Sequence, residues 1–326
     1  MPMEVYAFSN REDVLKKASS GGGFLAVADA FFQIEPHREH AVYGVCFQED
    51  LMPVYRRVDA LEDCARFCGS KYVRAELGDT YARVKEDLAG GTLVLFVGTP
   101  CFVAGLRKNV EAAGVPCEGL YCVDLICHGT PSVGYWMDYK AWLEKKYKDK
   151  LTDYAFRSHR EGAGAYAAVA HFEKKTVTGD LEVGLYNRLF LRHYVFVPGC
   201  FACPFANLDR TGDITLGDFW GIEQVMPEFP KKHVSEVLVN TPEGMHLMTR
   251  IKDSAEQNGY TVAQCMSEDY VKYQNNLQRP ADKPADYEQF QADYQKGGME
   301  LVTKKYVGYD AKGRIKHRIK KLLVRH

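Results

Sequence analysis

The stretch TLVLFVGTPC at residues 92–101 says most about the fold, because an unbroken apolar run there ends in a Gly-Thr-Pro turn and a cysteine. The run predicts a buried strand, and the FVAGLRKNV that follows has the apolar spacing of a helix. GLYCVDLI at residues 119–126 repeats this layout and ends at Cys127. Because open α/β sheets bind ligands at the rim formed by their strand ends, we expect Cys101 and Cys127 to meet at one rim.

Short apolar runs alternate with helical patterns along the rest of the chain, which predicts an α/β fold of the mixed α+β type. We expect a central mixed sheet flanked by helices, with a cysteine-bearing loop region. The predicted strands are 40–47, 92–98, 119–126, 213–217 and 234–240, and the predicted helices are 23–33, 80–89, 102–113, 134–148 and 242–257. A boundary near residue 90 divides the chain into the parts 1–90, 91–300 and a basic tail, 301–326.

The composition is that of an ordinary globular protein, with 326 residues, 46% hydrophobic and 26% charged, and a net charge of −1. This balance gives no general attraction to nucleic acid. The first residues carry charges where a signal peptide needs an apolar stretch, so we expect a cytoplasmic protein. Ten cysteines in a reducing compartment serve a metal, a cluster or catalysis more readily than disulfides.

A third cysteine block, PGCFACP at residues 198–204, adds Cys200 and Cys203 at CxxC spacing. Together with Cys101 and Cys127 these residues form the ligand set that an iron–sulfur cluster needs. Zinc accepts the same four thiols, or three of them with His128, so both metals remain open. The other cysteines are interpreted as packing or surface residues; they are Cys46, Cys64, Cys68, Cys117, Cys122 and Cys265.

Three further segments carry polar groups suited to a nucleotide. KASSGGGF at residues 17–24 precedes a predicted helix, so its backbone and the helix start suit a phosphate, although a plain N-cap loop is the alternative. GSKYVRAELGD at 69–79 adds a cation and an aromatic ring, and Asp218 in TGDITLGDFWGIE at 211–223 could hold a ribose or orient a ring nitrogen. His128, beside Cys127, is the expected proton carrier.

Two segments have less regular patterns. Residues 158–180 are glycine-rich and charged, which predicts a mobile insertion or a hairpin over the site. The final AKGRIKHRIKKLLVRH, residues 311–326, has seven Lys and Arg residues, no acidic residue and one apolar helical face. It suits peripheral contact with an anionic membrane at its inner face, with a solvated terminal helix as the alternative.

Taken in order, the motifs resemble those of the coenzyme F420 hydrogenase/dehydrogenase beta-subunit family over roughly residues 15–250. The motifs that carry the resemblance are SSGGGF, GSKYVRAELGD, VLFVGTPCFVAGL, VDLICHGTPS, CFACPFANLDRTGDITLGDFWG and SEVLVNTPEG. The resemblance implies an oxidoreductase in which FAD lies close to one [4Fe–4S] cluster. It also implies hydride exchange with a soluble carrier, such as the deazaflavin coenzyme F420 or another hydride carrier.

Residue by residue, the resemblance implies that the cluster ligands are Cys101, Cys127, Cys200 and Cys203. It implies that the flavin nucleotide is held by Ser19, Ser20, Gly21, Gly22, Ser70, Lys71 and Tyr72, and we add Asp218. No ferredoxin-like CxxCxxC module precedes the flavin part, so electrons are expected from a separate partner such as a ferredoxin, or from a small molecule.

The chain departs from the family pattern at Phe102, at the VPGC before the CxxC, and at residues 156–159, which leaves the substrate open. Short bacterial relatives occur with surface-polysaccharide biosynthesis. Two alternatives therefore stand beside the redox function: a nucleotide-sugar-binding transferase in glycan synthesis, and a zinc-binding module without redox activity.

Overall fold

The computed structural model describes residues 1–158, 167–230, 233–313 and 315. Its main feature is an eight-stranded mixed sheet with the strand order β11-β1-β10-β9-β5-β4-β2-β3. The bounds are β1 Glu4–Ser9, β2 His40–Phe47, β3 Pro53–Val58, β4 Leu93–Gly98, β5 Leu120–Leu125, β9 Ile214–Asp218, β10 Ser235–Val239 and β11 Thr261–Gln264. The pairs β2–β4, β4–β5 and β5–β9 are parallel, and the other neighbours are antiparallel.

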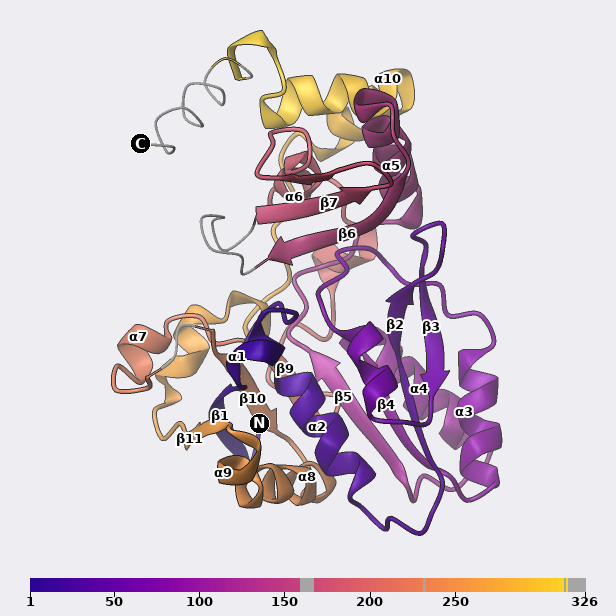
Figure 1. The fold of residues 1–326 in the computed structure, drawn as a ribbon, viewed down its shortest axis with the longest axis vertical. Helices are drawn as coiled ribbons and strands as arrows, with labels where there is room; N and C mark the ends of the chain where they lie inside the picture. The colour runs from indigo at the N-terminus through magenta and orange to yellow at the C-terminus, as the bar shows by residue number, and fades with distance from the viewer. Residues whose placement is uncertain (159–166, 231–232, 314, 316–326) are drawn as a thin grey trace.

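Helices cover both faces of the large sheet (Figure 1). On one face lie α2, Gly23–Phe32, and α8, Pro242–Asp253; on the other lie α3, Thr80–Ala89, and α4, Pro100–Ala112. In β4, Leu93 and Leu95 pack on the α2 and α8 side, whereas Val94 and Phe96 pack on the α3 and α4 side. A strand covered on both faces needs apolar side chains in both directions, which explains the unbroken run of β4.

A smaller antiparallel sheet, β6-β7-β8, forms a second body. Its strands are β6 Leu151–Ser158, β7 Ala167–Phe172 and β8 Thr176–Thr178, and its helices are α5 Val133–Tyr147, α6 Leu185–Leu191 and α10 Tyr287–Val307. Aromatic rings fill its core, with Trp136, Tyr139 and Tyr186 fully buried. We call this part the small-sheet body and the rest the large-sheet body; they lie one above the other in Figure 1.

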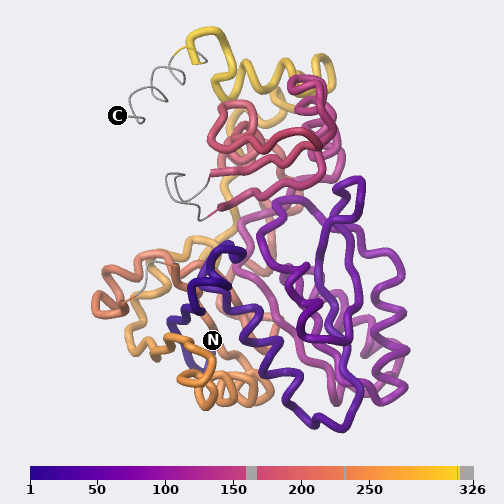
Figure 2. The backbone as a smooth tube through the Cα atoms, in the orientation of Figure 1, coloured from indigo at the N-terminus to yellow at the C-terminus, as the bar shows by residue number. Residues whose placement is uncertain are grey.

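The chain crosses between the two bodies three times. Residues 126–132 lead from β5 into α5, residues 192–213 lead from α6 back to β9, and residues 265–286 lead from β11 to α10. The backbone trace in Figure 2 shows the last of these crossings: the orange segments lie in the large-sheet body, and the yellow segments that follow them lie in the small-sheet body. The indole N–H of Trp136 donates to the carbonyl of Leu51 at 2.7 Å, which ties the small-sheet body to the loop between β2 and β3.

Short helical segments complete the connections. They are α1 Glu12–Leu15, η1 Glu62–Phe67, η2 Pro198–Ala202, α7 Ile222–Val225, α9 Ala255–Asn258, η3 Glu268–Tyr273 and η4 Asn275–Leu277.

All five predicted strands and all five predicted helices are present, with ends shifted by a few residues, and the α/β fold with a large mixed sheet is confirmed. The predicted helix 242–257 is split into α8 and α9. The sheet is continuous across residue 90, because β2 on one side of that position pairs with β4 on the other. The division of the chain into the parts 1–90 and 91–300 stays a prediction.

The predicted insertion at 158–180 contains the β7–β8 hairpin, and its residues 159–166 lie outside the described residues. The same holds for most of the basic tail, from which the structure describes only residues 311–313 and 315. Within the described part of the chain, every helix is too short or too polar to cross a lipid bilayer.

Candidate functional site

Cys101 lies where β4 ends and α4 begins. Thr99 is the N-cap of α4, Pro100 is its first residue, and Cys101 is the second, so this thiol lies in the first turn, at the positive end of the helix dipole. The thiol is exposed, and its Sγ lies 3.2 Å from Oγ1 of Thr99. The sequence predicted this position at the rim of the sheet.

Cys127 follows β5 on the neighbouring strand, in the first crossing segment. Burial raises the pKa of its thiol to about 12, while the backbone N–H of Gly129 acts in the opposite direction. The thiols of Cys101, Cys200 and Cys203 raise this pKa further, because they are close enough for their negative charges to oppose that of Cys127. Three segments far apart in sequence therefore bring Cys101, Cys200 and Cys203 within electrostatic range of Cys127.

In the CxxC, Cys200 lies in η2 and Cys203 is the C-cap of η2. This part of the second crossing segment is hydrogen-bonded to the first crossing segment. The N–H of Val197 donates to the carbonyl of Thr130 at 3.0 Å, and the N–H of Thr130 donates to Sγ of Cys200 at 3.4 Å. Gly129 has φ +135°, and a Cβ there would lie 2.4 Å from the ring of Phe196, so only glycine allows this close pairing.

Cys203 has a more open environment. Burial raises the pKa of its thiol, the N–H of Phe205 and the cation of Arg210 lower it, and Cys101 and Cys200 raise it. Across residues 1–158, 167–230, 233–313 and 315, no group of three or more His, Cys, Asp or Glu side chains is arranged to hold a single metal ion. A four-iron cluster makes a different demand, because each cysteine then binds its own iron and the sulfurs lie further apart.

The remaining cysteines lie elsewhere. Cys46, Cys64, Cys122 and Cys265 are buried, Cys68 is half-buried at the end of η1, and Cys117 is exposed. The Cys64 thiol donates to the carbonyl of Ala60 at 3.7 Å inside the core of the large-sheet body. Their interpretation as packing or surface residues stays a prediction, and Cys68 lines a cavity together with Cys127.

A cavity of about 350 Å³ adjoins Cys127, and we call it the cysteine-side cavity. Its walls come from the start of α2, the end of η1, the strand ends of the large sheet and residues of the first and third crossing segments. It is lined by all but one of the predicted nucleotide residues together with His128: Ser19, Ser20, Gly22, Ser70, Lys71, Tyr72, Asp218 and His128. Gly21 is the exception.

The glycine loop is held tightly by protein contacts. A Cβ on Gly21 would lie 2.3 Å from backbone atoms of Phe8 and Ser235, so this glycine lets the loop approach β1 and β10. Gly22 has φ +74° and is the N-cap of α2. The Ser20 hydroxyl donates to the carbonyl of Val234 at 3.1 Å. Much of the SSGGG sequence is thus explained by packing, and the start of α2 remains open to the cavity.

Lys71 points back into its own loop. Its Nζ donates to the carbonyls of Phe67, Cys68 and Gly69 at 3.2, 3.0 and 3.1 Å. Burial lowers the pKa of Lys71 to about 8. The ammonium therefore fixes the turn after η1 and contributes positive potential to the cavity, without a free donor of the kind that the sequence predicted for a diphosphate.

The other predicted residues are also held in place. The ring of Tyr72 stacks on Phe190 at 4.2 Å between centroids, and Oδ2 of Asp218 accepts a bond from Arg157 at 2.5 Å. Arg157 reaches Asp218 from β6, so this ion pair joins the two bodies across the cavity.

His128 lies where the three crossing segments meet. Its Nε2 is 2.7 Å from Nε2 of His193, and its Nδ1 is 3.2 Å from the amide nitrogen of Asn276. Nδ1 of His193 is in turn 2.8 Å from the carbonyl of Asp282. Burial, together with the neighbouring His193, lowers the pKa of His128 to about 4. His128 is therefore neutral near pH 7, and its role as proton carrier stays a prediction.

Sequence reasoning missed the third crossing segment. Gln274 lines the cysteine-side cavity, and its amide donates to the carbonyl of Asp218 at 2.6 Å and to the carboxyl of Glu236. Glu236 is fully buried, its Oε1 has no partner among the described residues, and burial raises its pKa to about 8. The sequence did contain one sign of this contact: Glu236 is a charged residue within the otherwise apolar strand sequence SEVLV, so it needed a polar partner from another segment.

Comparisons with known proteins agree with this architecture. A family profile that describes the C terminus of the coenzyme F420 hydrogenase/dehydrogenase beta subunit matches residues 91–263, which is more than half of the chain. A solved structure of the F420-reducing [NiFe] hydrogenase complex from Methanosarcina barkeri contains a similar chain, with a TM-score of 0.52 and 16% identity. The match covers 90% of this chain and 92% of that chain, and at this identity it concerns the fold alone. No curated protein matches the chain.

The fold defines an α/β protein with a large mixed sheet, and the profile match makes the assignment specific. The chain belongs to the coenzyme F420 hydrogenase/dehydrogenase beta-subunit family. The sequence resemblance is thereby confirmed, and the oxidoreductase character of the family applies to the fold described above.

Proposed function

We propose that this protein is an FAD- and [4Fe–4S]-dependent oxidoreductase that passes electrons between a soluble hydride carrier or substrate and the cluster. The observation that carries the proposal is the convergence of four thiols from three distant segments beside the cysteine-side cavity. Cys127 belongs to both features, since it is one of the four thiols and also lines the cavity. A cluster bound to Cys127 would thus lie directly beside a flavin bound in the cavity.

The donor set fits a cluster. The ligands would be Cys101, Cys127, Cys200 and Cys203. Two backbone N–H groups, of Gly129 and Thr130, already point at ligand sulfurs, and N–H donors of this kind stabilise the charge on a cluster.

The cavity fits part of a flavin. Three exposed large apolar side chains line it, Leu125, Leu191 and Trp220, and a bound aromatic ring system would cover them. The N-terminus of α2 offers N–H donors to a phosphate, as the sequence predicted for Gly22 and its neighbours. When both groups are bound, the flavin supplies two-electron hydride chemistry and the cluster supplies one-electron transfer.

The chain's own residues would orient these groups and handle the proton. Asp218 and Arg157 form an ion pair at the cavity wall. Either side chain could hydrogen-bond to a polar edge of the flavin ring while the ion pair stays formed. His128 lines the cavity and its Nε2 lies 2.7 Å from Nε2 of His193, so a proton could pass between the two rings along this hydrogen bond. We propose a ferredoxin-like protein or a small hydride carrier as the redox partner, and a cytoplasmic location, where the thiols stay reduced.

Anaerobic purification tests the proposal through a visible spectrum with iron, sulfide and flavin analysis. We expect about four irons and four sulfides per chain, together with one flavin. A colourless protein with stoichiometric zinc would refute the cluster in favour of the zinc module. A protein without flavin that binds nucleotide sugars in calorimetry would refute the redox function in favour of the transferase.

A further inference from the structure

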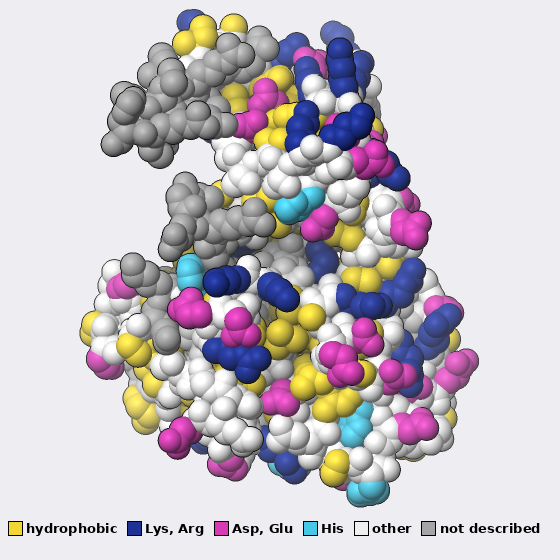
Figure 3. Space-filling view, in the orientation of Figure 1, with side chains coloured by type: hydrophobic (Ala, Val, Ile, Leu, Met, Phe, Trp, Pro, Cys, Tyr) yellow, Lys and Arg dark blue, Asp and Glu magenta, His cyan; other side chains and the backbone are white. Residues whose placement is uncertain are grey.

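A second and larger cavity, of about 870 Å³, lies between the two bodies. We call it the basic cavity. Figure 3 shows a hollow between the bodies with Lys and Arg side chains on its rim. None of the four predicted cluster ligands lines it, so it is a site separate from the cysteine rim. A cavity of this volume is large enough for a ligand of nucleotide size.

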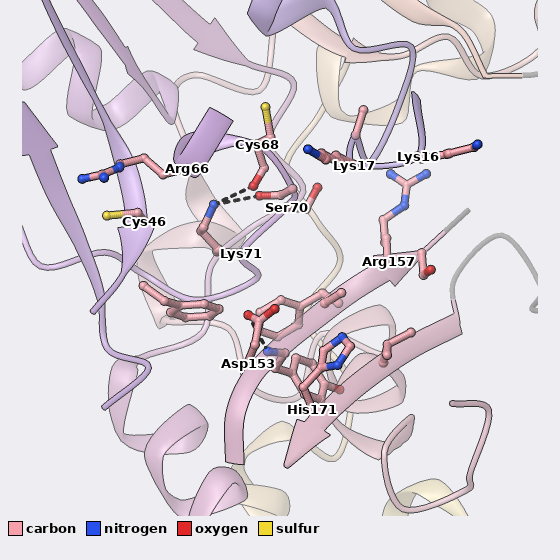
Figure 4. A pocket seen from close by; sticks show the side chains of 18 of the residues that line it. Lys16, Lys17, Cys46, Arg66, Cys68, Ser70, Lys71, Asp153, Arg157 and His171 are labelled. Atoms are coloured by element: carbon pink, nitrogen blue, oxygen red, sulfur yellow. Dashed lines mark hydrogen bonds between the residues drawn. The ribbon is translucent and has the colours of Figure 1, made fainter. Parts of the chain in front are cut away.

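Cations dominate its walls. They come from the end of α1, from η1 and the turn after it, and from β6; they are Lys16, Lys17, Arg66, Lys71 and Arg157. Against these five stand two carboxylates, Glu49 and Asp153. Figure 4 shows Lys17, Arg66 and Lys71 on one side of the space and Asp153 and His171 on the other. The excess of positive charge favours an anionic ligand.

Three of these cations are available to a ligand. Lys16 and Lys17 are exposed and form no ion pair with any described residue, and Arg66 has only a 3.5 Å contact with the exposed Asp63. By contrast, Lys71 is committed to three carbonyls and Arg157 to Asp218. Flexible lysines act as point charges toward phosphate, and an arginine adds a fork of donors.

The basic cavity adjoins the cysteine-side cavity. Both are lined by Ala18, by residues 68–71 and by Arg157, so ligands in the two spaces would be neighbours on either side of these residues. The far wall carries Asp153 and His171 on the exposed face of the small sheet, where carboxylate and imidazole can bond to hydroxyl groups. The site therefore combines phosphate-type and hydroxyl-type recognition next to the proposed flavin.

We propose that the basic cavity binds the phosphate groups of a small anionic substrate whose reacting end extends past Ser70 and Arg157 into the cysteine-side cavity. This inference rests on the proposed function only in assuming that the group bound in the cysteine-side cavity is a flavin. Binding itself requires Lys16, Lys17 and Arg66.

Calorimetric titration of the purified protein with inorganic pyrophosphate tests the site. The test variant is K16Q/K17Q/R66Q. The control is K148Q/K150Q/K174Q, which removes the same charge from three exposed lysines that lie among Glu144, Asp149 and Glu173 on the small-sheet body. We expect binding at least about tenfold weaker in the test variant, because three charge-assisted contacts are lost, and binding within about twofold of the parent in the control.

Flavin content, measured on the same samples, separates this inference from the proposed function. Unchanged flavin with weakened pyrophosphate binding supports a substrate site. Equal weakening in both variants would overturn the inference, because pyrophosphate would then sense only net charge. Loss of flavin from the test variant alone would also overturn it, since the cavity would belong to the cofactor. Absence of flavin and iron from the parent protein would refute the proposed function. The difference in pyrophosphate affinity between the two variants would still test the basic cavity as a phosphate site.

Discussion

Replacing Arg210 by methionine should destabilise the protein and loosen the cysteine site together. The guanidinium is 1% exposed and lies 3.2 Å from a carboxylate oxygen of Asp124, which is 0% exposed. It also donates to the carbonyls of Phe205 at 2.9 Å and Asn207 at 3.1 Å, just after Cys203, and to that of Leu125 at 3.1 Å, two residues before Cys127. One side chain thus binds both cysteine segments.

The magnitude follows from the burial. Removing one partner of a fully buried ion pair costs about 3–5 kcal/mol when the other charge is left uncompensated. Asp124 keeps hydrogen bonds from Thr211, Gly212 and Thr215, so we expect a cost at the lower end of this range, about 3 kcal/mol. The stability of a folded protein is about 5–15 kcal/mol, so the loss is a large fraction of it. With a urea slope of about 3 kcal/mol per molar, the unfolding midpoint should fall by about 1 M or more. Iron per chain should fall as well, because the loop carrying Cys203 is no longer tied to β5.

Arg83→Met is the matched control. Its ion pair with Asp79 is on the surface, with both side chains more than half exposed, so the unfolding midpoint and the iron content should stay near those of the parent. Urea unfolding followed by circular dichroism, with iron analysis, measures both effects. If Arg210→Met behaved like Arg83→Met, the reasoning about the buried clamp would be wrong.

Three further predictions concern the ligands, a buried acid and the glycine loop. Cys200→Ser should lower iron and the visible absorption, whereas Cys265→Ser should not; equal iron in both variants would contradict the ligand assignment. Glu236, with its pKa raised from 4.5 to about 8, holds a proton in the folded state that the unfolded state lacks between those values. Stability should therefore fall as pH rises through this window, by up to about 1.4 kcal/mol per pH unit, and Glu236→Gln should remove that slope in urea unfolding at several pH values. Gly21→Ala should destabilise strongly, because its Cβ would lie 2.3 Å from the backbone of β1 and β10. A Cβ at Gly23 meets only side chains, of Leu216 at 3.3 Å and Ser235 at 3.5 Å, so similar melting temperatures for Gly21→Ala and Gly23→Ala would refute this account.

Local patterns sufficed wherever burial alone dictates a secondary structure. The apolar run of β4 could form only a strand covered on both faces, and the turn after it placed Cys101 at a helix start, as predicted. The small sheet was harder to predict, because β8 has only three residues and β6 carries polar residues toward the basic cavity. The third crossing segment has no regular hydrophobic period, so its contact with His128 left no signal in the sequence.

The order of amino acids was enough to predict the α/β class, the strands and helices of the large sheet, the family, and which cysteines stand at the ends of strands and turns. How those side chains meet depends on the folded chain. The chain crosses three times between two bodies, which brings residues separated by more than a hundred positions into contact. Folding also commits Lys71 to its own loop, since a buried ammonium must find acceptors and three carbonyls lie within reach. Hydrophobic periodicity acts within a segment, whereas the pairing of buried polar groups depends on neighbours that come together only in the folded chain.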